Sequence, residues 1–211
     1  MMLAAYERGE DLHRQTAALV LQKPAEAVTK EDRQMAKAVN FGLIYGQTAK
    51  GLVEYARTAY GVALTETEAR RHRDRFFNAY AGLAAWHDRT RARAEADDGM
   101  EARTTLGRRR VLPTGREFFW QRFAGALNSP VQGGAADGMK LALRLVAERL
   151  PTGARIVSTV HDEVIVEAPA ALADEDKTLL ETAMIEAMRQ NFPGMPVVVE
   201  ATSGPTWEAL K

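Results

Sequence analysis

The sequence contains no cysteine, which excludes disulfides and metal sites built from thiolates. It has no apolar run approaching the ~18–20 residues of a membrane span, and no signal-peptide pattern at its start. Internal repeats and low-complexity tracts are also missing. The composition, 46% hydrophobic and 27% charged over 211 residues, is that of an ordinary globular protein. These features predict a cytoplasmic protein with one large domain, or one domain and a subdomain.

Net charge is absent as well, because 28 basic and 28 acidic residues cancel. The two signs are nevertheless unevenly distributed. Residues 162–211 contain ten acids and three bases, a net charge of −7, so residues 1–161 carry +7. Residues 103–122 alone contain six arginines and one acid. A basic part joined to an acidic part indicates an anionic partner for the basic part.

Hydrophobic periodicity and capping patterns predict an α+β fold with a mostly helical first half. Two β-rich runs, ARIVSTV and EVIVEA, predict a hairpin with HD between them, and MPVVVEA predicts a last strand. Residues 101–120 fit a hairpin or an irregular loop. The expected helices cover residues 9–22, 30–45, 48–58, 65–80, a following stretch to about 96, 121–149 with an interruption near Pro130 and Gly133–Gly134, and 172–191.

The helix predicted over residues 30–45 carries a conspicuous residue at every fourth position: Arg33, Lys37, Phe41 and Tyr45. Four residues advance a helix by about 6 Å and 40°, so the first three share a face. Two cations at that spacing can hold a triphosphate, and an aromatic ring one turn further on can stack on a base or sugar. The alternative is an amphipathic helix with the cations in solvent and both rings in a core.

The predicted hairpin places His161, Asp162 and Glu163 at its tip. A carboxylate displayed on a rigid hairpin suits a hard cation such as Mg²⁺. The alternative is a polar turn without further function, since aspartate is common in turns.

Taken together, these segments resemble DNA polymerase family A. The stripe formed by Arg33, Lys37, Phe41 and Tyr45 resembles motif B of that family, and VHDEVIVEAP resembles its motif C. Further stretches agree in the same order along the chain: GEDLHRQTA, TTLGRRRVLP, ALNSPVQGGAADGMKLA and VEATSGPTWEAL. The resemblance implies part of a right-hand polymerase fold, with residues 9–100 in the fingers and residues 101–211 in a partial palm.

The resemblance also implies roles for individual residues. It implies a DNA-directed DNA polymerase in replication or repair, with deoxynucleoside triphosphates and primer–template DNA as partners. The residues expected at the nucleotide are His13, Arg33, Lys37, Phe41 and Tyr45. Those expected at DNA are Arg108, Arg109, Arg110, Asn128 and Gln132. Those expected at the catalytic centre are His161, Asp162 and Glu163, with Asp162 as a ligand of Mg²⁺.

The chain departs from the family pattern in two places. A basic residue that often precedes the asparagine by four positions is replaced by Ala124, and Arg122 lies two residues away. The family's motif A, a strand with the second catalytic aspartate, has no counterpart before Gly9. We therefore expect the 211 residues to be inactive alone and to act with a second polypeptide that supplies motif A and the thumb. The alternatives are a non-catalytic remnant that binds nucleotide or DNA, and a related single-subunit RNA polymerase.

Overall fold

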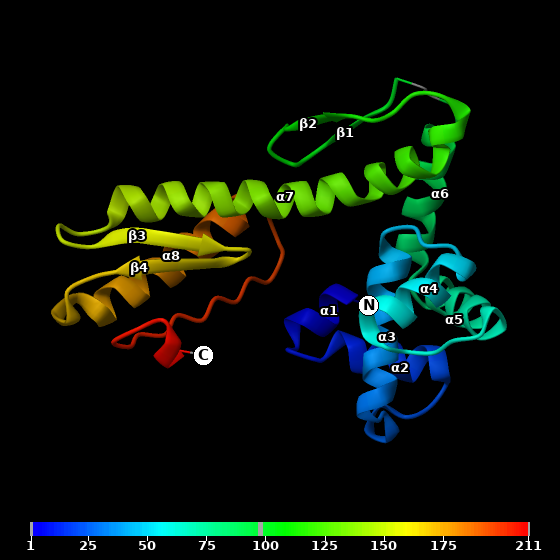
Figure 1. Cartoon of the computed structure of the whole chain (residues 1–211), viewed down its shortest axis with the longest axis horizontal. Helices are drawn as coiled ribbons and strands as arrows, with labels where there is room; N and C mark the ends of the chain where they lie inside the picture. The colour runs from blue at the N-terminus through cyan, green and yellow to red at the C-terminus, as the bar shows by residue number, and fades with distance from the viewer. Residues whose placement is uncertain (1, 97–98, 211) are drawn as a thin grey trace. The chain divides into compact units, whose positions relative to one another are not determined.

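The computed structural model describes residues 2–96 and 99–210, which divide into two compact units. The first unit comprises Met1–Ala102 and Arg109–Ser129, and the second comprises Arg103–Arg108 and Pro130–Lys211. Eight α-helices and two small antiparallel sheets lie within the described residues, which confirms the predicted α+β class (Figure 1). None of the helices in these ranges is both long enough and apolar enough to cross a bilayer.

Helices dominate the chain from its start, in the order shown by the colours of Figure 1. The α-helices are α1 (Met2–Glu7), α2 (Leu12–Leu21), α3 (Lys30–Ile44), α4 (Ala49–Tyr60), α5 (Glu66–Ala79), α6 (Ala81–Ala96), α7 (Phe119–Arg149) and α8 (Ala173–Asn191). The strands are β1 (Glu101–Arg103), β2 (Arg109–Val111), β3 (Arg155–Val160) and β4 (Glu163–Glu167). Short 3₁₀ turns cover Ala25–Ala27, Arg116–Phe118, Ala170–Leu172 and Glu208–Leu210.

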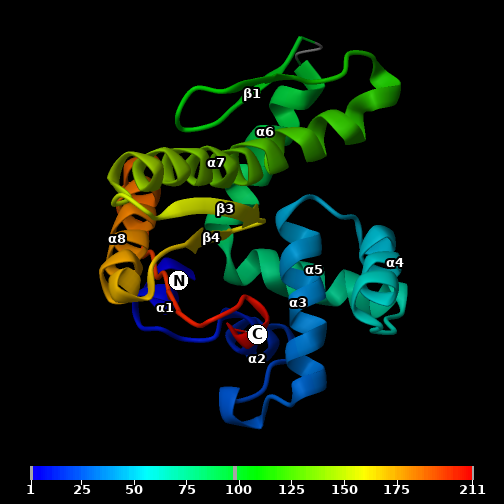
Figure 2. The same ribbon diagram turned by 60° about the vertical axis from the view of Figure 1, so that its left-hand side comes forward.

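The core of the first unit forms where α3 packs against α2, α4 and α5 (Figure 2). Phe76 of α5 is its largest fully buried side chain. Around it lie Val20, Met35, Val39, Leu43, Leu52, Ala69 and Tyr80. One face of α3 is therefore fixed in the core, and its opposite face is left for other contacts.

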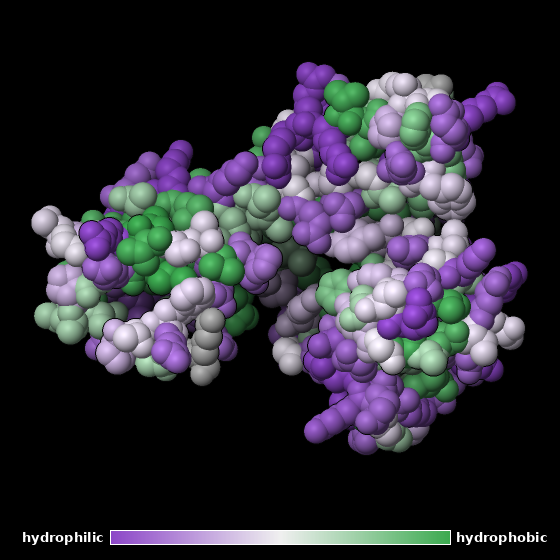
Figure 3. All heavy atoms as spheres, viewed as in Figure 1, coloured by the Kyte–Doolittle hydropathy of each residue, from purple (hydrophilic) through white to green (hydrophobic). Residues whose placement is uncertain are grey.

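The second unit has a smaller core between α8, the C-terminal half of α7 and the β3–β4 hairpin. Its buried members are Ala142, Leu145, Val146, Ala183 and Ala187. The hairpin is antiparallel, with a register irregularity between Ile156 and Ser158. Figure 3 shows hydrophobic atoms gathered over this hairpin, where Val157 of β3 is exposed.

The predicted interruption of the helix over residues 121–149 is wrong, because α7 runs unbroken through Pro130. The glycines near Pro130 mark close packing instead of a break. A Cβ on Gly133 would lie 2.9 Å from Thr104 Cγ2, and one on Gly134 would lie 2.7 Å from the ring of Phe192. Glycine is thus required there for the approach of neighbouring segments.

The predicted last strand is also wrong: residues 195–200 form an irregular segment. Val198 is 84% exposed, and the backbone N–H of Ala201 donates to Glu181 of α8 at 3.0 Å. A run of β-branched residues favours an extended backbone, but strand formation also needs a partner for the backbone groups.

Candidate nucleotide site and acidic hairpin

The α3 helix is fixed at both ends by its own sequence. Thr29 and Asp32 form a capping box, with the Asp32 N–H donating to Thr29 Oγ1 at 3.2 Å and the Thr29 N–H donating to Asp32 Oδ2 at 2.8 Å. At the other end Gly46 has a φ of 88°, and the N–H of Gln47 donates to the Gly42 carbonyl at 2.9 Å. These contacts match a Schellman C-cap and confirm the predicted helix ends.

The four stripe residues of α3 are partly exposed to solvent. Phe41 is 42% exposed, so the alternative that places it in the core is wrong. Arg33 and Lys37 are half-buried. Tyr45 is the half-buried C-cap residue of the helix, one further step around the axis. Two cations and an exposed ring therefore lie on one face of α3.

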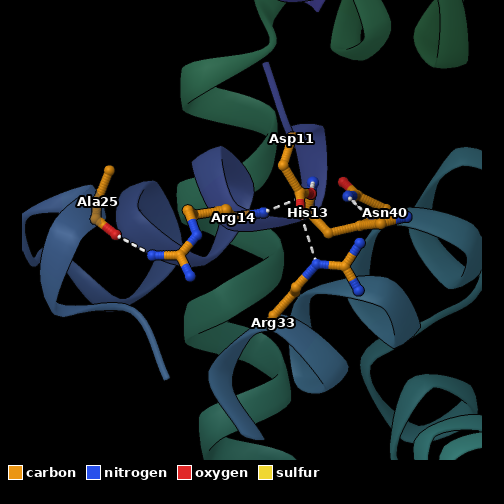
Figure 4. Close-up of polar contacts among 6 residues, drawn as sticks. All are labelled: Asp11, His13, Arg14, Ala25, Arg33 and Asn40. Atoms are coloured by element: carbon orange, nitrogen blue, oxygen red, sulfur yellow. Dashed lines mark hydrogen bonds and ion pairs between the residues drawn. The ribbon is translucent and has the colours of Figure 1, made fainter. Parts of the chain in front are cut away.

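Figure 4 shows how residues before α3 support this face. Arg33 donates from Nε to Asp11 Oδ2 at 2.5 Å. The other oxygen of Asp11 caps α2 by accepting from the N–H groups of His13 at 2.9 Å and Arg14 at 3.1 Å. Burial would raise the pKa of Asp11, but Arg33 and the two N–H groups outweigh it and lower that pKa. A charged Asp11 thus orients Arg33 and begins α2.

His13 lies against the same face. Its ring centroid is 5.7 Å from that of Phe41, and its Nδ1 is 3.0 Å from Asn40 Nδ2 (Figure 4). Burial lowers the pKa of His13, and the nearby cations Arg33 and Lys37 lower it further against the opposing pull of Asp11. We therefore expect a neutral imidazole at neutral pH, so the positive charge of the face comes from Arg33 and Lys37.

Packing and backbone conformation explain why glycine stands at positions 42 and 46. A Cβ on Gly42 would lie 2.9 Å from Leu52 Cδ1 and 3.2 Å from Tyr55 Cδ1, so α4 can approach α3 only at a glycine. Gly46 adopts a positive φ as the residue after the C-cap. Neither glycine is by itself evidence for nucleotide binding.

The predicted DNA-contacting arginines lie on and beside the β1–β2 hairpin. All three are exposed, and each has a partner within its own unit. Arg108 pairs with Asp137 at 3.0 Å, Arg109 pairs with Glu101, and Arg110 donates to Ser129 Oγ at 3.2 Å. Arg108 and Arg109 each have a carboxylate partner, whereas Arg110 donates to a hydroxyl, so Arg110 can turn to an external phosphate without breaking an ion pair.

The α7 helix carries the remaining predicted DNA residues. Asn128 is half-buried in the first unit, and Gln132 is exposed in the second. Arg122 does not substitute for the basic residue missing at Ala124. It is 2% exposed and donates to the carbonyl oxygens of Ala94, Pro113 and Gly115 at 2.8–3.0 Å, so its role is structural.

The acidic hairpin tip is a two-residue turn, because Val160 pairs with Glu163. His161 has a φ of 55°, at a turn position that usually favours glycine. His161, Asp162 and Glu163 are all exposed, and both acids line one cavity of about 470 Å³. Within residues 2–96 and 99–210, no group of three or more His, Asp or Glu side chains could hold a metal ion.

Sequence reasoning missed the residues that support the site. Asp11 holds Arg33, and Asn40 holds His13. Asp11 belongs to the GEDLHRQTA stretch and Asn40 to the helix predicted over residues 30–45, so both lie inside segments that the sequence patterns identify. Spacing on one helix could not reveal them, because their partners come from another helix.

This fold and these two groups of side chains define an α+β protein with a cationic, aromatic helix face and an acidic hairpin. A sequence model described as DNA polymerase family A matches residues 1–209. The chain belongs to DNA polymerase family A, as its motifs predicted.

Individual relatives agree. The chain is 41% identical over 210 residues to DNA polymerase I of Aquifex aeolicus, covering 98% of this chain and 35% of that protein. It is 36% identical over 216 residues to the thermostable DNA polymerase I of Thermus thermophilus, covering 100% of this chain and 24% of that one. The chain thus spans about a third or less of these relatives.

A solved structure shows the same fold. The POL domain of Pol1 from M. smegmatis, in complex with a DNA primer–template and dNTP, superimposes with a TM-score of 0.74. Its sequence is 31% identical, and the match covers 88% of this chain and 32% of that one.

Proposed function

We propose that this chain forms the nucleotide-binding part and a portion of the palm of a DNA-directed DNA polymerase. The observation that carries the proposal is the exposed Phe41, which follows Arg33 and Lys37 on one face of a helix whose other face is core. A ring in solvent beside two cations suits a nucleotide better than it suits folding. The related POL domain in complex with primer–template and dNTP supports the same assignment.

In this proposal each residue of the face has its own task. Arg33 and Lys37 bind the triphosphate, with His13 donating to a phosphate oxygen. Phe41 packs on the sugar and base, and Tyr45 lies at the template position. Residues 9–100 are then the fingers and residues 101–211 a partial palm. Arg108, Arg109 and Arg110 meet DNA phosphates, and Asn128 and Gln132 contact the nascent duplex from its minor-groove side.

The acidic tip fits Mg²⁺ in part. Asp162 and Glu163 offer exposed carboxylate oxygens at the edge of one cavity, which is the ligand type that Mg²⁺ prefers. When bound, Mg²⁺ neutralises negative charge that develops on the transferred phosphoryl group. Asp162 would hold it, with Glu163 beside it and His161 near the primer terminus. Two ions need carboxylates that converge from separate strands, whereas these two are adjacent in sequence.

We therefore propose that a polypeptide segment outside these 211 residues supplies the second catalytic carboxylate. The purified 211-residue protein should show no primer extension above background with Mg²⁺. Adding a separately expressed chain with motif A and the thumb should restore extension, and Asp162→Ala should abolish it again. Robust extension by the 211 residues alone, free of host polymerase, contradicts this proposal.

Nucleotide affinity tests the helix face directly. Lys37→Ala should weaken dNTP binding about 10- to 100-fold, because a charge-assisted phosphate contact contributes roughly 1.5–3 kcal/mol. All four dNTPs should be affected alike, since phosphates carry no base identity. Phe41→Ala should weaken dNTP binding but leave binding of inorganic triphosphate largely intact. Lys50→Ala, an exposed lysine on α4, is the matched control.

The competing proposal is a non-catalytic remnant that at most binds nucleotide or DNA. Normal dNTP affinity of Lys37→Ala would remove the nucleotide site from both proposals. Binding without any restored extension, with both chains folded, would favour the remnant. In either case we expect a cytoplasmic location, where a bacterial-type DNA polymerase meets its DNA.

A further inference from the structure

Four side chains of the first unit form a hydrogen-bonded chain that leads from the core to His13. The hydroxyl oxygens of Tyr80 and Thr16 are 2.9 Å apart, and Thr16 donates to Asn40 Oδ1 at 3.0 Å. Asn40 Nδ2 is 3.0 Å from Nδ1 of His13. Thr16, Asn40 and Tyr80 are at most 5% exposed, whereas His13 is half-buried. This series of hydrogen bonds therefore connects the half-buried ring of His13 to buried side chains that water cannot reach.

Donors and acceptors fix the direction of this chain. An amide nitrogen only donates, so Asn40 Nδ2 makes Nδ1 of His13 an acceptor. Thr16 gives its single hydrogen to Asn40, so Tyr80 must donate to Thr16. Burial raises the pKa of Tyr80, so this hydroxyl keeps its hydrogen. Nδ1 of His13 then carries no hydrogen, and the hydrogen of the neutral ring is on Nε2.

The reverse direction fails at Tyr80. If the Asn40 amide turned over, His13 could donate from Nδ1 to Asn40, Asn40 to Thr16, and Thr16 to Tyr80. The Tyr80 hydrogen would then be buried with no acceptor found among the residues that the structure describes. An unsatisfied buried donor destabilises that arrangement. Without the Tyr80 hydroxyl, the reverse direction would leave the hydrogen of Thr16 without an acceptor instead. Thr16, which is bonded to Asn40, is therefore the residue that selects the direction.

We propose that Thr16, acting through Asn40, is a positioning residue that keeps His13 neutral with its hydrogen on Nε2. The inference rests on the proposed function, in which His13 binds the triphosphate. Since Nδ1 is occupied by Asn40, Nε2–H is the atom that His13 offers to a phosphate oxygen. A donor fixed in this way costs no reorientation when the nucleotide binds.

The charged surroundings of His13 act in the same direction. From α3, Arg33 and Lys37 oppose a positive charge on the ring, and Asp11 at the start of α2 favours one. Burial and the two cations prevail, so the pKa of His13 is lowered. On α5, Arg75 is engaged with the carbonyl of Val20 at the far end of α2.

The test is the ring tautomer of His13, read from ¹⁵N NMR of the 211-residue protein without ligand between pH 5 and 8. His13→Gln identifies its signals among the four histidines. The wild-type ring should be the Nε2–H tautomer. Thr16→Val keeps the shape of the buried side chain but removes the hydroxyl that is bonded to Asn40, so both tautomers should appear. The proton affinity of His13 should then rise about tenfold, which is a shift of one pH unit. Tyr60→Phe, a half-buried tyrosine outside the chain of bonds, is the control and should change neither property.

Tyr80→Phe leaves the bond from Thr16 to Asn40 in place, so this variant should keep the wild-type tautomer. An Nδ1–H tautomer in the wild type overturns the inference, as does an unchanged tautomer in Thr16→Val. Binding of dATP, measured on the same samples, separates the two proposals. If the tautomers behave as expected but no sample binds dATP, the proposed function fails while the tautomer assignment stands.

Discussion

The two groups of candidate residues are supported in opposite ways. Arg33, Lys37 and Phe41 project from a helix that is capped at both ends and packed on a core. Asp162 and Glu163 lie at the tip of a two-stranded hairpin, where the neighbouring segment contributes no strand among the described residues. The helix face is thus held in place by its own unit. The acidic tip has its position set by the backbone turn and by the hydrogen bond that Thr159 Oγ1 donates to the Glu163 carbonyl at 3.0 Å.

The largest expected difference between the two regions is in stability. Phe76→Ala should destabilise the first unit by about 3–5 kcal/mol, because it removes a fully buried ring and leaves a cavity. Val198→Ala in the second unit should change stability by no more than about 0.5 kcal/mol, because that side chain is largely exposed. Amide hydrogen exchange in α5 and α8 measures both units in one protein. Equal loss of protection in both helices after Phe76→Ala would show that the units unfold together and would end the comparison.

Local signals in the sequence predicted most of the fold. The helices predicted over residues 30–45 and 65–80 and the β3–β4 hairpin are confirmed, because their caps and turn depend on neighbours within a few residues. The two errors concern contacts between distant segments. Gly134 was interpreted as a helix break but makes room for Phe192, and residues 195–201 lack the backbone partner that a strand requires.

For the candidate site too, local signals were predictable and contacts between segments were not. Helical spacing placed Arg33, Lys37 and Phe41 on one face, and the structure agrees. The supporting residues Asp11 and Asn40 could not be found in that way, since they act between α2 and α3. The partners of Arg108 and Arg109 were equally hidden. Sequence therefore predicted which residues carry charge, but not which of those charges have a carboxylate partner.

The smallest expected effect concerns how α3 begins, compared with α8 of the second unit. Asp32 accepts from the Thr29 N–H in the capping box and pairs with Lys23, whereas α8 has no side-chain cap. The hydrogen bond from Lys23 has the largest effect on the pKa of Asp32 and lowers it below its usual value of 3.8. Burial opposes this shift, and the bonds with Thr29 lower the pKa further. A carboxyl group with a lowered pKa stabilises the fold above its unfolded pKa, and that stability is lost as the pH falls through the folded pKa.

Asp32→Asn should therefore cost about 1 kcal/mol at pH 7, the usual magnitude for a helix N-cap contact. The difference from wild type should begin to shrink once the pH falls below about 4, because the carboxyl of the unfolded chain then takes up a proton. It should vanish only below the lowered pKa of the folded state. Hydrogen exchange of α3 amides at pH 7 and urea unfolding at pH 3 and 7 measure the two limits. Asp174→Asn, the same change in the first turn of α8, is the matched control and loses only its interaction with the helix N-terminus. A cost that stays equal at both pH values would mean that shape, and not charge, fixes the start of α3 and with it the position of Arg33 and Lys37.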